Sequence, residues 1–226
     1  RADEVDILSQ RSDSGEPQVI WGLVAPEFGE PAFADYMVSQ PLLQYVQALL
    51  GPQLRLGGTS MFCNGSQAPY DTGWHRDMGG QERDASPEEE LELLGQHRKH
   101  YRKWHLALAD DPCLWIVPGS HRRARTERER EVMTTDKHAS LPGEQRLELK
   151  RGQTLFWNGN MIHRGRAPED LAERMSIVAH MERHRDGDGP APVDECFRWM
   201  LADNVRPALP EKMLVPYDRW YRLQQA

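Results

Sequence analysis

Cysteine and positive charge are both scarce in this sequence. Only three cysteines occur, Cys63, Cys113 and Cys196, and such an odd, sparse set does not predict a disulfide framework. We therefore expect a reducing, cytoplasmic setting. Lysine and arginine total 28 against 35 acidic residues, which gives a formal net charge of -7. This balance argues against nucleic-acid binding, because neutralising phosphates requires a basic surface.

Long apolar runs are missing as well. We find no stretch that predicts a membrane span and no secretory signal pattern. The hydrophobic fraction of 38% is still enough for a sizeable core, and 226 residues fit one generous domain or two small ones. One locally basic run, residues 121–125, is followed at once by glutamates. We interpret it as a solvated charged loop or helix start rather than a binding patch.

Helical patterns lie towards the two ends of the chain. Residues 1–18 form a polar segment that we expect to be a loop. Apolar residues at helical spacing predict a helix over residues 40–50, ended by Gly51 and Pro52, and an amphipathic stretch over residues 31–38 precedes it. Residues 193–226 are expected to form C-terminal helices, over about 193–203 and 217–225.

The middle of the chain follows the period of two that is typical of strands. Turn residues separate the alternating segments, among them the pair Asn64-Gly65 and the triplet Asp110-Asp111-Pro112. Many short strands with turn signals indicate a mainly β sandwich or barrel. The expected strands cover residues 54–63, 101–109, 113–117, 146–150, 154–157, 161–164 and 175–181, with extended chain at 70–77.

A charged segment at residues 79–100 interrupts the strands. It contains Pro87 followed by three glutamates, and we expect a helical or mobile insertion. Two interpretations remain open: a lid over a functional site, or a plain surface insertion.

The most informative motif is His75-Arg76-Asp77, just before this insertion. Alternate residues of a strand share a face, so His75 and Asp77 project together while Arg76 points away. His163, which follows a later apolar strand, is a candidate third ligand. Two imidazoles and one carboxylate are the ligands of mononuclear non-haem Fe(II) sites, whose opposite face stays open for a co-substrate and O₂. In a chain with nine histidines the triplet alone is a weak signal.

A second constellation, Arg174-Met175-Ser176, follows His163 by eleven residues. Its arginine and serine also share one strand face. A guanidinium offers a planar fork that matches a carboxylate, and the serine hydroxyl adds a donor. The pair could hold the distal carboxylate of 2-oxoglutarate while its keto-acid end binds the metal.

With these motifs the chain resembles the phytanoyl-CoA dioxygenase-like family of Fe(II)/2-oxoglutarate-dependent oxygenases, from about residue 42 to about residue 183. The resemblance implies a mainly β fold with flanking helices, a double-stranded β-helix (a jelly roll, cupin-like), as a single oxygenase domain over residues 1–226. The segments that carry it are Leu49-Leu50-Gly51-Pro52, His75-x-Asp77, Cys113-Leu114-Trp115-Ile116-Val117-Pro118-Gly119-Ser120-His121 and Gly152-Gln153-Thr154-Leu155-Phe156-Trp157, followed by His163 and Arg174.

The resemblance also implies roles for individual residues. Iron would bind His75, Asp77 and His163, and Arg174 would hold the distal carboxylate of 2-oxoglutarate. His105 stands where some members contact 2-oxoglutarate; a satisfied polar core residue is the alternative. Gly165 is a departure, because some relatives place a hydroxyl there, and Ser176 is expected to compensate.

Further positions narrow the chemistry that the resemblance implies. Relatives that transfer halogen have a small residue in place of Asp77, so a carboxylate there favours hydroxylation. His180 stands where nucleobase demethylases place a second arginine. His121 is expected to be structural. Trp74 and Trp157 flank the candidate ligands in sequence and are candidates for the substrate pocket, although most buried tryptophans only fill cores.

The leading hypothesis is an Fe(II)- and 2-oxoglutarate-dependent dioxygenase that hydroxylates a small organic substrate with O₂ and forms succinate and CO₂. The same cofactors could instead support desaturation, epimerisation or ring rearrangement. A hypothesis from another class is a catalytically silent metal-binding jelly roll used for sensing or assembly. A zinc hydrolase is disfavoured, because no helical His-Glu-x-x-His occurs. The substrate and the oligomeric state stay open.

Overall fold

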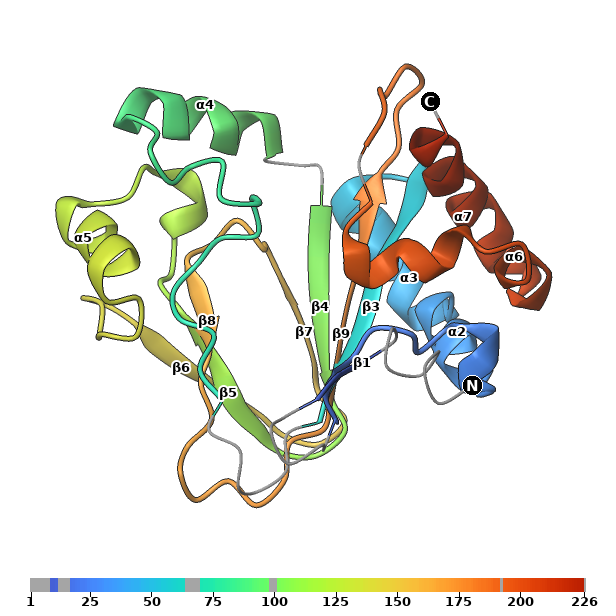
Figure 1. The fold of residues 1–226 in the computed structure, drawn as a ribbon, viewed down its shortest axis with the longest axis horizontal. Helices are drawn as coiled ribbons and strands as arrows, with labels where there is room; N and C mark the ends of the chain where they lie inside the picture. The colour runs from blue at the N-terminus through green and yellow to red at the C-terminus, as the bar shows by residue number, and fades with distance from the viewer. Residues whose placement is uncertain (1–8, 12–16, 64–69, 98–100, 192, 226) are drawn as a thin grey trace.

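Two antiparallel sheets form the frame of this computed structural model, which describes residues 9–11, 17–63, 70–97, 101–191 and 193–225. In Figure 1 the sheets face each other, lie close at one end and diverge at the other. The larger sheet has the order β1 (Ser9–Arg11), β2 (Pro17–Ile20), β3 (Leu54–Phe62), β9 (Ser176–Arg183), β4 (Tyr101–Ala107), β7 (Thr154–Trp157). The smaller sheet has the order β6 (Gln145–Leu149), β5 (Asp111–Ile116), β8 (His163–Gly165).

The chain before the insertion lies along the free edge of the smaller sheet. Asp71 pairs with Arg166 and His75 pairs with His163, each through an isolated antiparallel bridge. The segment is thus extended as expected, although it forms bridges rather than a regular strand. This pairing brings the His-x-Asp motif beside β8, some 90 residues further along the sequence.

Helices cover the outer side of each sheet (Figure 1). The larger sheet carries the helices of both chain ends: α2 (Ala32–Met37), α3 (Gln40–Leu50), the 3-10 helix η3 (Glu195–Leu201), α6 (Val205–Ala208) and α7 (Glu211–Gln224), with the 3-10 helix η1 (Pro26–Phe28) before α2. The smaller sheet is flanked by α4 (Pro87–His97), the 3-10 helix η2 (Ser120–Arg122) and α5 (Glu127–Thr135). Among the described residues, no helix is both long and apolar enough to cross a membrane.

The main hydrophobic core lies between the larger sheet and its helices. Trp104 of β4 and Ile177, Ala179 and Met181 of β9 are buried there, together with Met213 and other helical residues. Successive side chains of a strand point to opposite faces, so the alternate residues of β4 and β9 face the smaller sheet. Those positions hold Lys103, His105, Ser176 and His180. The inner faces of β4 and β9 therefore place these polar residues between the sheets, beside a smaller apolar cluster that includes Leu114, Ile116 and Trp157.

The jelly roll with flanking helices confirms the expected fold class. The predicted helix over residues 40–50 has the predicted bounds, and Gly51 ends it with a positive φ of 89°. Three local expectations were wrong. The polar N-terminal segment contributes β1 and part of β2. Asp111 and Pro112 begin β5 instead of forming a turn. The last helix begins at Glu211 rather than near residue 217, whereas the helix expected over about residues 193–203 is present as the 3-10 helix Glu195–Leu201. The expected turn at residues 64–65 lies outside the described residues.

Candidate metal and 2-oxo acid site

The structure brings the three candidate metal ligands together. One ligand atom each of His75, Asp77 and His163 lies within 4.8 Å of the other two. Asp77 Oδ1 is 3.8 Å from Nε2 of His75 and 3.7 Å from Nε2 of His163. The backbone bridge between the two histidines, with N–O distances of 2.9 and 3.0 Å, sets this approach.

Both imidazoles are held with Nε2 directed at the shared centre. His75 Nδ1 lies 2.8 Å from the carbonyl oxygen of Gly73, and His163 Nδ1 lies 2.8 Å from that of Met161. A carbonyl oxygen only accepts, so each Nδ1 carries the proton and each Nε2 keeps its lone pair. Backbone carbonyls orient metal-binding histidines in this way in many metalloproteins. The donor set therefore fits a divalent transition metal with two nitrogen ligands and one oxygen ligand.

Lys103 of β4 holds the other oxygen of the carboxylate. Its Nζ lies 2.6 Å from Asp77 Oδ2 and 5.2 Å from the centre of the Trp157 ring. Burial by itself raises the pKa of Asp77, but Lys103, followed by the two histidines beside it, outweighs burial and holds that pKa well below its usual range. The carboxylate stays ionised, and Oδ1 is left facing the histidines.

The two histidines differ in their surroundings. The His163 side chain is 5% exposed, whereas that of His75 is 40% exposed, so the centre opens on the His75 side. Trp157 packs edge-on against the His163 ring, with ring centres 4.5 Å apart. Burial, followed by the neighbouring His75, lowers the pKa of His163 to about 3, so this imidazole is neutral and free to bind a metal at neutral pH.

A second cluster between the sheets gathers the residues expected to bind 2-oxoglutarate. Its centre is Asp111, whose carboxylate has no exposed surface. Asp111 Oδ2 lies 2.9 Å from His105 Nε2 and 3.2 Å from Arg174 Nε, and it also accepts from the Ser176 hydroxyl. Asp111 Oδ1 accepts from the backbone N–H of Cys113 at 2.8 Å. In this structure His105 and Ser176 are therefore engaged by a protein carboxylate.

Arg174 keeps one donor group available. Its Nη1 is buried and has no hydrogen-bond partner among the described residues. The guanidinium carbon lies 4.8 Å from the centre of the Phe62 ring and 4.7 Å from that of Tyr70. Burial by itself lowers the pKa of Arg174, but the negative charge of Asp111 outweighs burial and raises that pKa above its usual value. A charged, enclosed guanidinium with an unused donor fits a carboxylate ligand.

Tyr70 explains the departure at Gly165. A Cβ added to Gly165 would lie 2.5 Å from a ring carbon of Tyr70 and 2.9 Å from its hydroxyl oxygen. A side chain at residue 165 and the tyrosine ring cannot share this space. Tyr70 thus places a hydroxyl close to residue 165, the position where some relatives have a hydroxyl-bearing side chain.

The two tryptophans of the expected substrate pocket lie in different places. Trp74 is 2% exposed and donates its indole N–H to the carbonyl of Ala139 at 2.8 Å. The guanidinium carbon of Arg164 lies 4.4 Å from the centre of its ring. It lies in the hydrophobic cluster beside α5. Trp157 contacts His163 and Lys103 directly. Their role in substrate binding stays a prediction, with Trp157 the better placed of the two.

Three residues of the site were missed from the sequence. Asp111 was assigned to a turn, and Tyr70 follows a segment with no clear pattern. Lys103 could have been predicted, because alternation along the strand places it on the same face as His105. No sequence rule indicated that this face looks towards the metal ligands.

Solved structures with the same fold share little sequence with this chain. Apo EctD from S. alaskensis matches with a TM-score of 0.59 at 15% identity, covering 81% of this chain and 62% of that one. AviO1 from Streptomyces viridochromogenes Tue57 matches with 0.53 at 17%, covering 81% and 73%. SnoN, a non-haem α-ketoglutarate-dependent epimerase from nogalamycin biosynthesis, matches with 0.52 at 18%, covering 82% and 76%. These likenesses establish a common fold, and the chain spans about three-fifths of the length of EctD.

Sequence similarity identifies the family more directly. No individual curated protein is significantly similar to the chain. The family model described as phytanoyl-CoA dioxygenase (PhyH) matches residues 31–174, which is more than half of the chain and includes both histidines, Asp77 and Arg174. A match of this extent shows that the chain belongs to the phytanoyl-CoA dioxygenase family.

Proposed function

We propose that this protein is an Fe(II)- and 2-oxoglutarate-dependent dioxygenase that hydroxylates a small organic molecule and releases succinate and CO₂. The observation that carries the proposal is the convergence of two oriented Nε2 atoms and one ionised carboxylate oxygen within 4.8 Å. Family membership supports it. EctD, which has the same fold, has been crystallised with Fe and with 2-oxoglutarate and 5-hydroxyectoine.

The iron would be held by His75, Asp77 and His163. When bound, it would supply the redox chemistry by which O₂ and 2-oxoglutarate oxidise the substrate. Lys103 contributes by binding Asp77 Oδ2, so that the carboxylate offers the single oxygen Oδ1 to the metal. A carboxylate ligand occupies a coordination position that halide transfer would need, and this favours hydroxylation over halogenation.

Arg174 would bind the distal carboxylate of 2-oxoglutarate. Its Nη1 is buried and unused, and it lies on the same face of the larger sheet as Ser176. Asp111 holds Arg174 through Nε, which fixes the direction of the remaining donors. The nearby Tyr70 hydroxyl is a further candidate donor to the same carboxylate, whereas the Ser176 hydroxyl already donates to Asp111. His105 then acts through Asp111, as a positioning residue.

The test separates metal binding from turnover. Fe(II) and 2-oxoglutarate, added to the metal-free protein without oxygen, should produce a visible charge-transfer absorption. Oxygen should then yield succinate, slowly even without substrate. His163→Ala should abolish both signals. Arg174→Ala should raise the 2-oxoglutarate concentration for half-maximal absorption at least tenfold, because one charge-assisted contact is lost.

Two variants serve as matched controls. His138→Ala removes a half-exposed histidine that pairs with Asp71, and Arg166→Ala removes a half-exposed arginine near the same carboxylate. Both should behave as the wild-type protein does. Wild-type protein that gives neither the absorption nor succinate would contradict the proposal and favour a silent metal-binding jelly roll.

A further inference from the structure

Arg76 lies between two metal ligands in sequence and points away from both. Its side chain has no exposed surface. Nη1 donates to Glu90 Oε1 at 2.6 Å, and Nη2 donates to the backbone carbonyls of Ser120 at 3.0 Å and Arg123 at 3.1 Å. The extended segment that carries His75 and Asp77 is therefore tied, on the side away from these ligands, to α4 and to residues 120–123.

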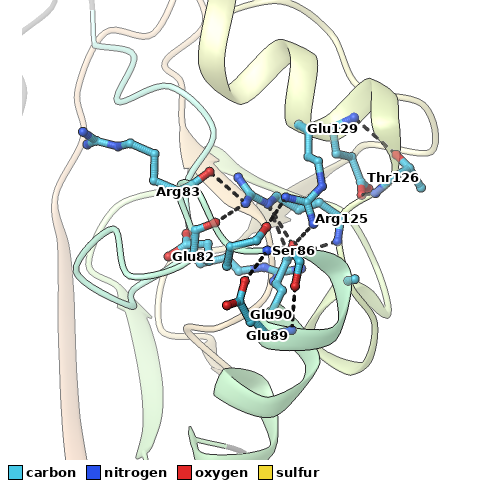
Figure 2. Close-up of polar contacts among 12 residues, drawn as sticks. Glu82, Arg83, Ser86, Glu89, Glu90, Arg125, Thr126 and Glu129 are labelled. Atoms are coloured by element: carbon cyan, nitrogen blue, oxygen red, sulfur yellow. Dashed lines mark hydrogen bonds and ion pairs between the residues drawn. The ribbon is translucent and has the colours of Figure 1, made fainter.

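Glu90 of α4 is the acidic centre of this network. Its side chain also has no exposed surface, and it accepts from Arg125 Nε at 3.2 Å (Figure 2). It also accepts from Arg130 Nη2 at 2.7 Å. The backbone N–H of Arg125 donates to it at 2.9 Å. The basic run at residues 121–125, expected to be a solvated charged loop or helix start, thus ends in a buried arginine, Arg125, whose guanidinium shares Glu90 with that of Arg76.

The same network reaches the third candidate ligand. Ser120, whose carbonyl accepts from Arg76, belongs to the Pro-Gly-Ser-His turn. Its hydroxyl donates to the carbonyl of Val117 at 2.7 Å and accepts from the backbone N–H of Ile162 at 2.8 Å. Ile162 immediately precedes His163 in sequence. Arg76 and Ser120 therefore connect both ligand-bearing segments.

We propose that Glu90, on the insertion helix α4, is a positioning residue for the metal centre: through Arg76 and Ser120 it holds the His75–Asp77 segment and His163 in the arrangement that their backbone bridge forms. The proposal rests on the proposed function of these ligands. A buried guanidinium without its carboxylate must move towards water, because an unpaired buried charge is strongly unfavourable. Arg76 cannot move without displacing the backbone of the two ligands beside it.

The insertion is anchored in a way that suits this role. Ser86 and Glu89 cap the start of α4 reciprocally, with distances of 2.8 and 3.2 Å (Figure 2). Arg125 Nη2 donates to the carbonyls of Glu82 and Arg83, which hold the loop before the helix. The segment from residue 82 to α4 is thus bound to the smaller-sheet side of the molecule. We assign it a supporting function rather than that of a lid.

The test compares two buried glutamates. Glu129 of α5 is 2% exposed and binds Arg123 at 2.6 and 2.7 Å, and its other hydrogen bonds go to Thr126. Co(II) affinity of the metal-free full-length protein is measured by calorimetry and by visible absorption, and urea unfolding is recorded in parallel. Glu90→Gln should weaken Co(II) binding at least tenfold and change the absorption spectrum. Glu129→Gln should bind Co(II) within twofold of wild type despite a comparable loss of stability.

A second variant keeps the test decisive if Glu90→Gln does not fold. Arg76→Lys retains the charge opposite Glu90 but cannot reach Glu90 and both carbonyls together. It should also bind Co(II) at least tenfold more weakly. Wild-type affinity in either folded variant, or an equal loss in Glu129→Gln, overturns the proposal. Wild-type protein that binds no Co(II) would instead contradict the proposed function of the site.

Discussion

Asp111 shows how much one buried carboxylate can organise. It joins β5 to β4 and β9 by accepting from His105, Arg174 and Ser176. Burial raises its pKa, but these partners outweigh burial and hold the pKa well below its usual range. The same enclosed surroundings raise the pKa of Cys113 to about 12, so that thiol stays protonated. The cluster thus keeps one anion and one cation ionised in a place that excludes water.

Asp111→Asn should lower the free energy of unfolding by about 3 kcal/mol, because it leaves the buried Arg174 without a countercharge. Urea unfolding followed by circular dichroism measures this change. The neighbouring Asp110 provides the control: its side chain is 60% exposed and pairs with Lys150 at 2.9 Å. Asp110→Asn should leave the free energy of unfolding close to the wild-type value. Equal effects of the two substitutions would contradict the assigned role of Asp111.

Two glycines, Gly51 at the end of α3 and Gly95 within α4, differ in whether the local backbone needs glycine. Gly51 ends α3 with φ 89°, a conformation that favours glycine. Gly95 lies exposed within α4, and nothing lies within 4 Å of a Cβ added there. The first glycine is needed by the turn that leads into β3, whereas the second only weakens its helix.

Gly95→Ala should therefore raise the free energy of unfolding by about 0.5–1 kcal/mol, since alanine has the higher helix propensity. Gly51→Ala should lower it by about 1 kcal/mol through backbone strain alone, because the nearest atom to its Cβ is 4.0 Å away. Thermal or urea unfolding of the two variants measures these changes in the free energy of unfolding. A loss of stability in Gly95→Ala would show that α4 needs the glycine for another reason.

The molecule as a whole divides its side chains between two layers. Apolar residues of the larger sheet pack against the helices of the two chain ends, and most of the buried charged groups of the site lie between the sheets, next to a small apolar cluster. The inner layer contains imidazoles whose neutral forms the fold requires. Stability of the metal-free protein should consequently depend on pH in a defined direction.

The pKa of His163 determines the direction of this pH dependence. Its pKa is about 3 when folded and near 6.5 when unfolded, so between these values the unfolded chain binds a proton that the folded protein does not. Stability should fall as the pH decreases from 6.5 and level off below 3. At pH 5 this residue alone should make the free energy of unfolding about 2 kcal/mol lower than at pH 7.5.

Urea titrations with EDTA at the two pH values measure the difference. His163→Gln removes the titrating group and should reduce the pH dependence by that amount. An unaltered pH dependence in His163→Gln would show that other groups cause it.

Local patterns in the sequence determined the fold class, the helix at residues 40–50 and the projection of His75 and Asp77 from one strand face, because these depend on the period of the backbone and on short-range turn chemistry. The resemblance to a known family added the assignment of His163 as the third ligand and of Arg174 as the residue for 2-oxoglutarate. Only the tertiary structure decided that Asp111 gathers Arg174, Ser176 and His105, that Lys103 holds Asp77, and that Glu90 anchors Arg76. These contacts join segments distant in sequence, and packing of the two sheets and α4 brings their charges together.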